Sequence, residues 1–141
     1  MAIKKLNDTK TFHFFNANPK DRRSCDCVVR AICTATGDSW EDTLRGLTEC
    51  AIKHSLMVND AKLYEKYLAD LGWKKMPAPR KENNKRYTGS EWCLHCKKNN
   101  LPNVQIAHIG GHHIVCIIDY KVWDIWNSTD GSIGNYWIRE S

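Results

Sequence analysis

The stretch His113-Ile-Val-Cys-Ile-Ile-Asp-Tyr-Lys-Val-Trp-Asp-Ile-Trp126 contains two apolar runs separated by the dipeptide Asp119-Tyr120. Short apolar runs bounded by turn residues are typical of strands, and a two-residue connection between them is typical of a β-hairpin. With a two-residue turn, Ile118 pairs with Lys121. The stretch therefore predicts an antiparallel hairpin in the last third of the chain.

The residues around this hairpin divide into a helical part and a strand-rich part. Apolar spacing and capping residues predict helices from Cys27 to about Thr36, from Ser39 to about His54, from Asn59 to about Gly72 and from Ser90 to about Lys98. Further strands are expected at 73–76, 104–109 and 136–139, and residues 10–15 form a short strand or an extended arm. This segregation predicts the α+β class, with a helical N-terminal half packed on a small C-terminal antiparallel sheet.

Length and charge narrow the class of protein. The 141 residues are expected to form a single domain, with an arm and loop over 1–24, a helical half over 25–99 and a β half over 100–141. Lys and Arg number 21 against 16 Asp and Glu, and this mild surplus of +5 makes a nucleic-acid partner unexpected. The apolar runs are too short for a membrane span, and no secretory signal is visible, so a cytoplasmic location is expected.

Seven cysteines are an unusual count for a chain of this length. An odd number cannot pair completely within one chain, and without a signal peptide the simplest expectation is a reducing compartment with free thiols. These cysteines are Cys25, Cys27, Cys33, Cys50, Cys93, Cys96 and Cys116. We therefore ask whether one of the thiols is chemically special.

Cys27 is the strongest candidate for a reactive thiol. It follows a polar loop and opens an apolar helix, with Asp26 as the expected N-cap. The positive end of a helix dipole favours a thiolate over a thiol, and the thiolate is the nucleophilic form. A partly buried cysteine in the first turn of a helix, with a packing role only, is the competing interpretation.

His113 is the candidate base for this thiol, and Asp124 and Asn127 are the candidates to orient its ring. In the predicted register Asp124 shares the face of His113, and Asn127 lies just beyond it; one extra residue in the turn would place Asn127 directly opposite. Either side chain can accept a hydrogen bond from the imidazole, which orients the ring so that its other nitrogen faces a thiol. A histidine satisfied within the core is the competing interpretation.

The motifs resemble the bacteriocin-processing branch of the papain-like cysteine peptidases. Asp26-Cys-Val-Val-Arg-Ala-Ile32 looks like that group's Asp-Cys-x-x-x-Ala, Gly111-His-His-Ile-Val-Cys-Ile117 looks like its Gly-x-His strand, and Ile125-Trp-Asn-Ser128 is similar to the Asn-Ser of papain-type enzymes. The resemblance covers roughly residues 18–130. It implies a papain-like fold, a peptide or protein substrate, no cofactor, and an origin in a phage or its bacterial host.

The same resemblance assigns roles to individual residues. Cys27 would be the nucleophile, His113 the general base and acid, and Asn127 the residue that orients the imidazole, with Asp124 as the alternative. The family's oxyanion-hole glutamine falls on Asp21, so Asn18 is the substitute donor beside the backbone N–H of Cys27. The sequence thus predicts a cysteine hydrolase that forms an acyl-enzyme on Cys27.

Two other patterns support a non-catalytic alternative, in which a papain-like scaffold serves as an interaction protein. Cys93-Leu-His-Cys96 has the spacing of half a zinc site, and Cys25 with Cys27, or His112 with Cys116, are the candidate second pair. The basic segment 80–86 has the charge to contact nucleic acid, although a solvated surface loop is the favoured interpretation.

Overall fold

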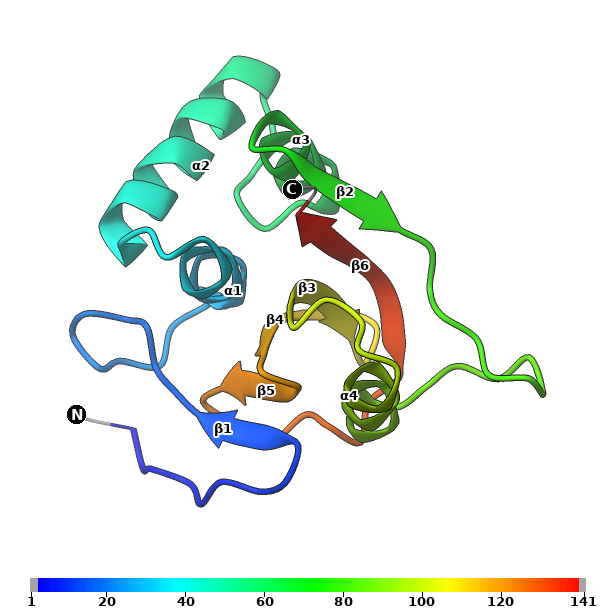
Figure 1. Cartoon of the computed structure of the whole chain (residues 1–141). Helices are drawn as coiled ribbons and strands as arrows, with labels where there is room; N and C mark the ends of the chain where they lie inside the picture. Colours follow the sequence, from blue (N-terminus) through cyan, green and yellow to red (C-terminus); the bar gives the residue numbers. More distant parts are fainter. Residues whose placement is uncertain (1–2, 140–141) are drawn as a thin grey trace.

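The computed structural model describes residues 3–139 and confirms the α+β class. Figure 1 shows a curved sheet with helices on both of its sides. The helices are α1 (Cys27–Thr36), α2 (Trp40–His54), α3 (Ala61–Asp70) and α4 (Gly89–Lys98). The strands are β1 (Phe12–Phe14), β2 (Trp73–Met76), β3 (Val104–Ile109), β4 (His113–Ile118), β5 (Lys121–Asp124) and β6 (Ile133–Arg139).

The first helix has the limits that its sequence predicts. It begins at Cys27, and it ends at Gly37, whose backbone has a φ of 82° and whose N–H donates to the carbonyl of Cys33 at 2.9 Å. A left-handed glycine at this place satisfies a carbonyl of the last turn and stops the helix. Asp26 occupies the predicted N-cap position, but its side chain makes no capping hydrogen bond and is bonded to Arg30 and Trp40 instead.

The caps of α3 and α4 differ from those predicted. Asp60, and not Asn59, occupies the N-cap of α3. The N-cap of α4 is Thr88, whose hydroxyl accepts from the N–H of Glu91 while the Glu91 carboxylate accepts from the N–H of Thr88. These two hydrogen bonds satisfy the backbone N–H groups of Thr88 and Glu91. A helix capped by Ser90 would leave these two donors without this pairing.

The sheet contains the predicted hairpin and one pairing that was not predicted. Ile118 pairs with Lys121 across a two-residue turn, and both turn residues have positive φ values, 51° at Asp119 and 61° at Tyr120. The strand order is β1-β5-β4-β3-β6-β2, and β1 runs parallel to β5. The sheet is therefore mixed and not purely antiparallel as expected. The parallel pairing could not be predicted, because a strand of three residues carries no pattern that identifies its partner.

The helices cover the sheet on both sides and form two cores. Helices α1, α2 and α3 pack on one face, where Ile106, Ile114 and Trp137 are buried. Helix α4 packs on the other face, against residues that include Ala107 and Val115. No helix in the described range 3–139 is long and apolar enough to cross a membrane. This arrangement brings the start of α1 to the start of β4.

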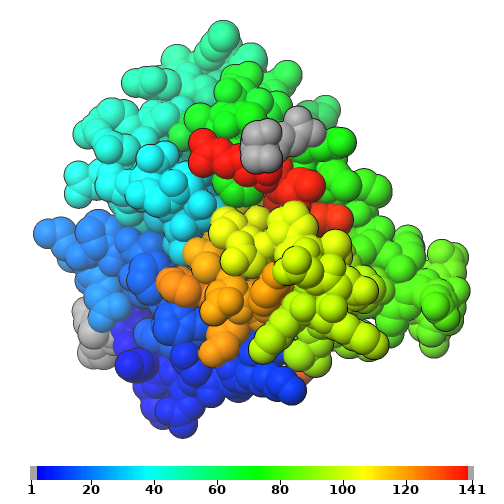
Figure 2. Space-filling model, viewed as in Figure 1, coloured from blue at the N-terminus to red at the C-terminus, as the bar shows by residue number. Residues whose placement is uncertain are grey.

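The basic segment between β2 and α4 extends away from the body of the protein. It is the green projection in Figure 2, closed by an antiparallel bridge between Arg80 and Arg86. Lys81 forms an ion pair with Glu91 at 2.9 Å, which ties the segment to the first turn of α4. The projection lies on the α4 side of the molecule, away from α1.

Candidate active site

Cys27 and His113 meet where α1 and β4 begin. Each is the first residue of its element, and α1 packs directly on β4. The two side chains line the same cleft, and each shifts the pKa of the other. Cys27 is half-buried, so the thiol is in contact both with the core and with the surface.

Asp124, the last residue of β5, orients the imidazole. The Nε2 of His113 donates to its Oδ2 at 2.5 Å, which leaves Nδ1 for the thiol. The indole ring of Trp126 lies beside the imidazole, with the ring centroids 4.9 Å apart. The carboxylate and the indole therefore hold the ring in the orientation that a base for Cys27 requires.

A buried guanidinium connects Asp124 to the helix that carries Cys27. Arg30 donates from Nη1 to Oδ1 of Asp124 at 2.6 Å and from Nε to Oδ1 of Asp26 at 2.8 Å. The three side chains are only 8%, 1% and 5% exposed, respectively. Because one arginine bonds both carboxylates, it fixes the start of α1 relative to the end of β5. We refer to Arg30, Asp26 and Asp124 as the buried clamp.

The electrostatics of the site favour an ion pair. Burial opposes ionisation of the Cys27 thiol, but its hydrogen bond to His113, the charge of His113 and the N–H of Ile114 together lower the pKa of Cys27 below its usual value. Burial also opposes protonation of His113, yet the hydrogen bonds to Asp124 and Cys27 raise its pKa to about 9. Both shifts favour the charged forms, a thiolate on Cys27 and an imidazolium on His113.

At the buried cysteines elsewhere no histidine assists ionisation, and burial outweighs the hydrogen bonds that they receive. Burial raises the pKa of Cys93 to about 12 and that of Cys96 to about 11, and it also raises the pKa values of Cys116 and Cys33. A thiol with a raised pKa is a poor nucleophile at neutral pH. Cys27 is therefore set apart from these cysteines by its histidine partner.

Cys27 and His113 line a small cleft with a volume of about 190 Å³. The side chains that line it come from the loop before α1, from α1 itself and from the ends of β4 and β5; they are Arg23, Ser24, Cys25, Cys27, Arg30, His113, Ile125 and Trp126. Trp126 is 42% exposed and forms an aromatic wall beside the histidine. A bound molecule in this cleft would lie directly against the thiolate.

Asn127 is not placed where the sequence interpretation expected it. Its side-chain oxygen accepts from the N–H of Thr129 at 3.0 Å and from the hydroxyl of Thr129 at 2.6 Å. The amide thus closes a local turn after β5, and the position beside His113 belongs to Asp124. The reason is the turn length: the two-residue turn after Ile118 gives the register in which Asp124 shares the face of His113.

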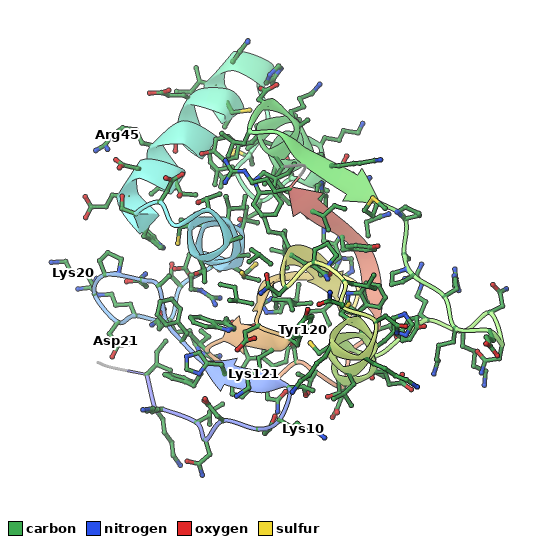
Figure 3. All side chains as sticks on the ribbon, in the orientation of Figure 1. Lys10, Lys20, Asp21, Arg45, Tyr120 and Lys121 are labelled. Carbon is green, nitrogen blue, oxygen red and sulfur yellow. The ribbon has the colours of Figure 1, made fainter. Side chains whose placement is uncertain are left out.

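Asn18 is likewise engaged elsewhere. Its Nδ2 donates to Oδ2 of Asp26 at 3.2 Å, and its Oδ1 accepts from the N–H of Lys20 at 2.9 Å. The amide supports the buried clamp, and Asn18 is not among the residues that line the cleft. Asp21 lies at the outer side of the loop, where Oδ1 accepts from Asn16 (Figure 3).

The sequence interpretation did not identify the full set of site residues. Arg30 pairs with Asp26 four positions earlier, which is an ordinary spacing for an ion pair within one helix. Its second partner, Asp124, lies 94 positions away, so no local pattern signals it. Arg23 and Cys25, which line the cleft, carry no motif; their place just before the helix was the only signal.

The predicted half zinc site lies in the opposite core. Cys93 and Cys96 are fully buried on α4, and the Sγ of Cys96 accepts from Nε2 of Gln105 at 3.4 Å. Within residues 3–139, no group of three or more His, Cys, Asp or Glu side chains is arranged to hold a metal ion. The two cysteines pack as small apolar side chains in this core.

Replacing Asp124 with Asn is expected to lower the pKa of His113 from about 9 toward the ordinary 6.5. The charge that opposes the effect of burial is then lost, while burial itself remains. The titration of the His113 ring protons by NMR measures this pKa. Asn127→Ala is the control and should leave the pKa of His113 near 9. If Asn127→Ala lowered this pKa and Asp124→Asn did not, Asn127 would be the residue that orients the imidazole.

The same shift connects folding to pH. Because the folded-state pKa of His113 is raised, its contribution to stability is fully present below about 6.5 and is lost as the pH rises through about 9. The lowered pKa of Cys27 has the opposite effect on stability, because the folded state releases that proton earlier than the unfolded chain. Denaturant unfolding of Cys27→Ala, which removes this opposing contribution, should therefore show a falling free energy of unfolding as the pH rises from about 6.5. Adding Asp124→Asn to Cys27→Ala is expected to make this fall shallower.

Comparisons with known proteins leave the site to be interpreted from its geometry. No protein-family model, no curated protein and no solved structure matches the chain.

Proposed function

We propose that the protein is a cysteine hydrolase that cleaves a peptide, isopeptide or side-chain amide bond through an acyl-enzyme. The observation that carries this proposal is that Cys27 and His113 line one cleft, while Asp124 accepts a hydrogen bond from the imidazole of His113. A nucleophile, a base and a residue that orients the base, brought together beside a cleft, is the arrangement that nucleophilic catalysis requires.

The reaction follows from the charges of the resting site. The thiolate of Cys27 attacks the carbonyl carbon of the substrate and forms a tetrahedral intermediate. The imidazolium of His113 gives its proton to the departing amine, and a thioester remains on Cys27. A water molecule then attacks the thioester while His113 takes its proton, and the product carboxylic acid leaves as the thiolate is restored.

The first turn of α1 supports the negative oxygen of the intermediate. The earliest helical hydrogen bond runs from the N–H of Arg30 to the carbonyl of Asp26, so the N–H groups of residues 27–29 precede the helical ladder. N–H groups at a helix start carry partial positive charge and bind anions. The N–H of Cys27 is therefore the oxyanion donor that we assign to the site.

The free thiols are compatible with a reducing compartment. All seven cysteines are unpaired in the structure. A nucleophilic cysteine must remain reduced to act, and the cytosol maintains thiols in that state. We therefore place the enzyme in the cytoplasm as part of the same proposal.

An activated ester tests the proposed acyl-enzyme without knowledge of the natural substrate. Mixing with p-nitrophenyl acetate is expected to release a burst of p-nitrophenolate near one equivalent per chain, followed by slower turnover. Intact-mass and peptide analysis should place the acetyl group on Cys27. The burst should disappear in Cys27→Ala and persist in Cys25→Ala, the matched control from the same cleft.

Two results would contradict the proposal. Acetylation spread evenly over the exposed cysteines, or a burst that survives in Cys27→Ala, would show that Cys27 has no special reactivity. A stable acetyl group on Cys27 with no turnover would favour the non-catalytic scaffold, because deacylation by His113 and water is then missing.

A further inference from the structure

The cleft beside Cys27 is lined by basic groups and by no carboxylate. Its charged lining residues besides the thiolate are Arg23, Arg30 and His113. Ser24, Cys25, Ile125 and Trp126 complete the lining and are neutral when Cys25 is a thiol. The acidic residues of the site, Asp26 and Asp124, are buried behind Arg30. A ligand in the cleft therefore meets cationic groups directly.

Arg23 differs from the other two basic groups because its charge is not neutralised. Arg30 is bonded to two carboxylates, and His113 is shared between Asp124 and Cys27. Within residues 3–139 the side chain of Arg23 has no hydrogen-bond or ion-pair partner. It is exposed at the rim of the cleft. Its guanidinium is therefore available to a ligand.

The loop that carries Arg23 is held on both sides. Before it, Asn16 donates from Nδ2 to the carbonyl of Arg22 at 3.3 Å and to Oδ1 of Asp21 at 3.1 Å. After it, Asn59 donates from Nδ2 to the carbonyl of Cys25 at 3.3 Å. These hydrogen bonds hold the backbone on both sides of Arg23, so the segment that carries its side chain is anchored beside the cleft.

We propose that the cleft selects acyl donors that carry a carboxylate close to the scissile carbonyl, and that Arg23 is the residue that binds this carboxylate. The guanidinium presents paired N–H donors that match the two oxygens of a carboxylate. The carboxylate belongs either to an acidic side chain of the substrate or to a free carboxyl terminus. This inference rests on the proposed function, because it concerns the substrate of the same site.

Two alkylating reagents of similar size test the role of Arg23 without any turnover. Iodoacetate carries a carboxylate beside its reactive carbon, and iodoacetamide is its neutral counterpart. The ratio of their rates at Cys27, measured by peptide mapping, reports how well the cleft accepts the anion. Removing this cation from the lining of the cleft in Arg23→Ala should lower the ratio roughly three- to tenfold.

Arg22→Ala is the matched control. Arg22 is exposed on the same loop but does not line the cleft, so its removal should leave the ratio within about twofold of the wild type, since exposed charges farther away are screened. Equal ratios in the wild type and Arg23→Ala, with both proteins folded by circular dichroism, would overturn the inference. A fall of the same size in both variants would also overturn it.

This experiment separates the two proposals. If Cys27 reacts with both reagents only at the pH of an ordinary thiol, the proposed hydrolase function fails, while the ratio still measures the effect of Arg23. If Cys27 reacts at low pH but the ratio does not depend on Arg23, the hydrolase function stands and the carboxylate preference fails.

Protection of Cys27 from iodoacetamide identifies the source of the carboxylate. The three probes are an amidated peptide with one glutamate, its glutamine counterpart, and the glutamine peptide with a free carboxyl terminus. Stronger protection by the first indicates an acidic side chain, and stronger protection by the third indicates a chain end. In Arg23→Ala the peptide that carries the preferred carboxylate should protect Cys27 no better than the other two. Equal protection by all three peptides in the wild type would contradict the proposal.

Discussion

Replacing His113 with Ala is expected to raise the pH at which Cys27 reacts with iodoacetamide to about 8.5 or above, the range of an unassisted thiol. The hydrogen bond and positive charge that lower the pKa of Cys27 are then lost, while the burial that raises it remains. Near pH 6 the rate should fall at least about tenfold, because the smaller thiolate fraction outweighs the higher intrinsic nucleophilicity of a thiolate with a higher pKa.

His112→Ala is the control for this variant. His112 is exposed and immediately precedes His113, so its removal changes the same turn without touching the thiol. Its pH profile for alkylation of Cys27 should overlie that of the wild type. If His113→Ala retains rapid labelling at low pH, the helix terminus alone activates Cys27 and the histidine is not its partner.

The second large effect concerns stability. Arg30→Met is expected to lower the free energy of unfolding by about 3–5 kcal/mol, because removing one member of a buried ionic group leaves uncompensated buried charge. Here two carboxylates lose their shared cation at once. Equilibrium unfolding in urea measures the change, with the slope compared between variants to confirm that the same surface is exposed.

Arg45→Met provides a matched comparison on the surface. Arg45 extends outward from α2 and pairs with Asp42 at 3.2 Å, and the two side chains are 67% and 74% exposed (Figure 3). The loss should be below about 1 kcal/mol, as for most exposed ion pairs. If Arg30→Met costs no more than Arg45→Met, the buried clamp does not stabilise the fold.

Much of the architecture could be predicted because its causes are local. Gly37 ends α1 through its own backbone conformation, and Ser39 caps α2 by accepting from the N–H of Asp42. The hairpin between β4 and β5 could also be predicted from the two turn residues between its apolar runs. In each case a few neighbouring residues contain the whole explanation.

The parts that could not be predicted depend on contacts between distant segments. The choice between Asp124 and Asn127 depended on a single turn residue, because a one-residue change of register alters which side chain faces His113. The parallel pairing of β1 with β5 joins the beginning of the described chain to its last third. The hydrogen bond from Asn18 to Asp26 could not be predicted either, because the sequence does not show that Asp26 is buried.

The buried clamp also determines when during biosynthesis the thiol becomes reactive. Arg30 is bonded to a partner 94 positions later, and His113 and Asp124 both follow most of the helices in the chain. A nascent chain that has exposed α1 at the ribosome therefore carries Cys27 without its base and without the carboxylate that orients the base. Long-range contacts of this kind form late in folding. Reactivity of Cys27 at low pH is therefore expected only after β4 and β5 have joined α1, and before that Cys27 should react as an ordinary thiol.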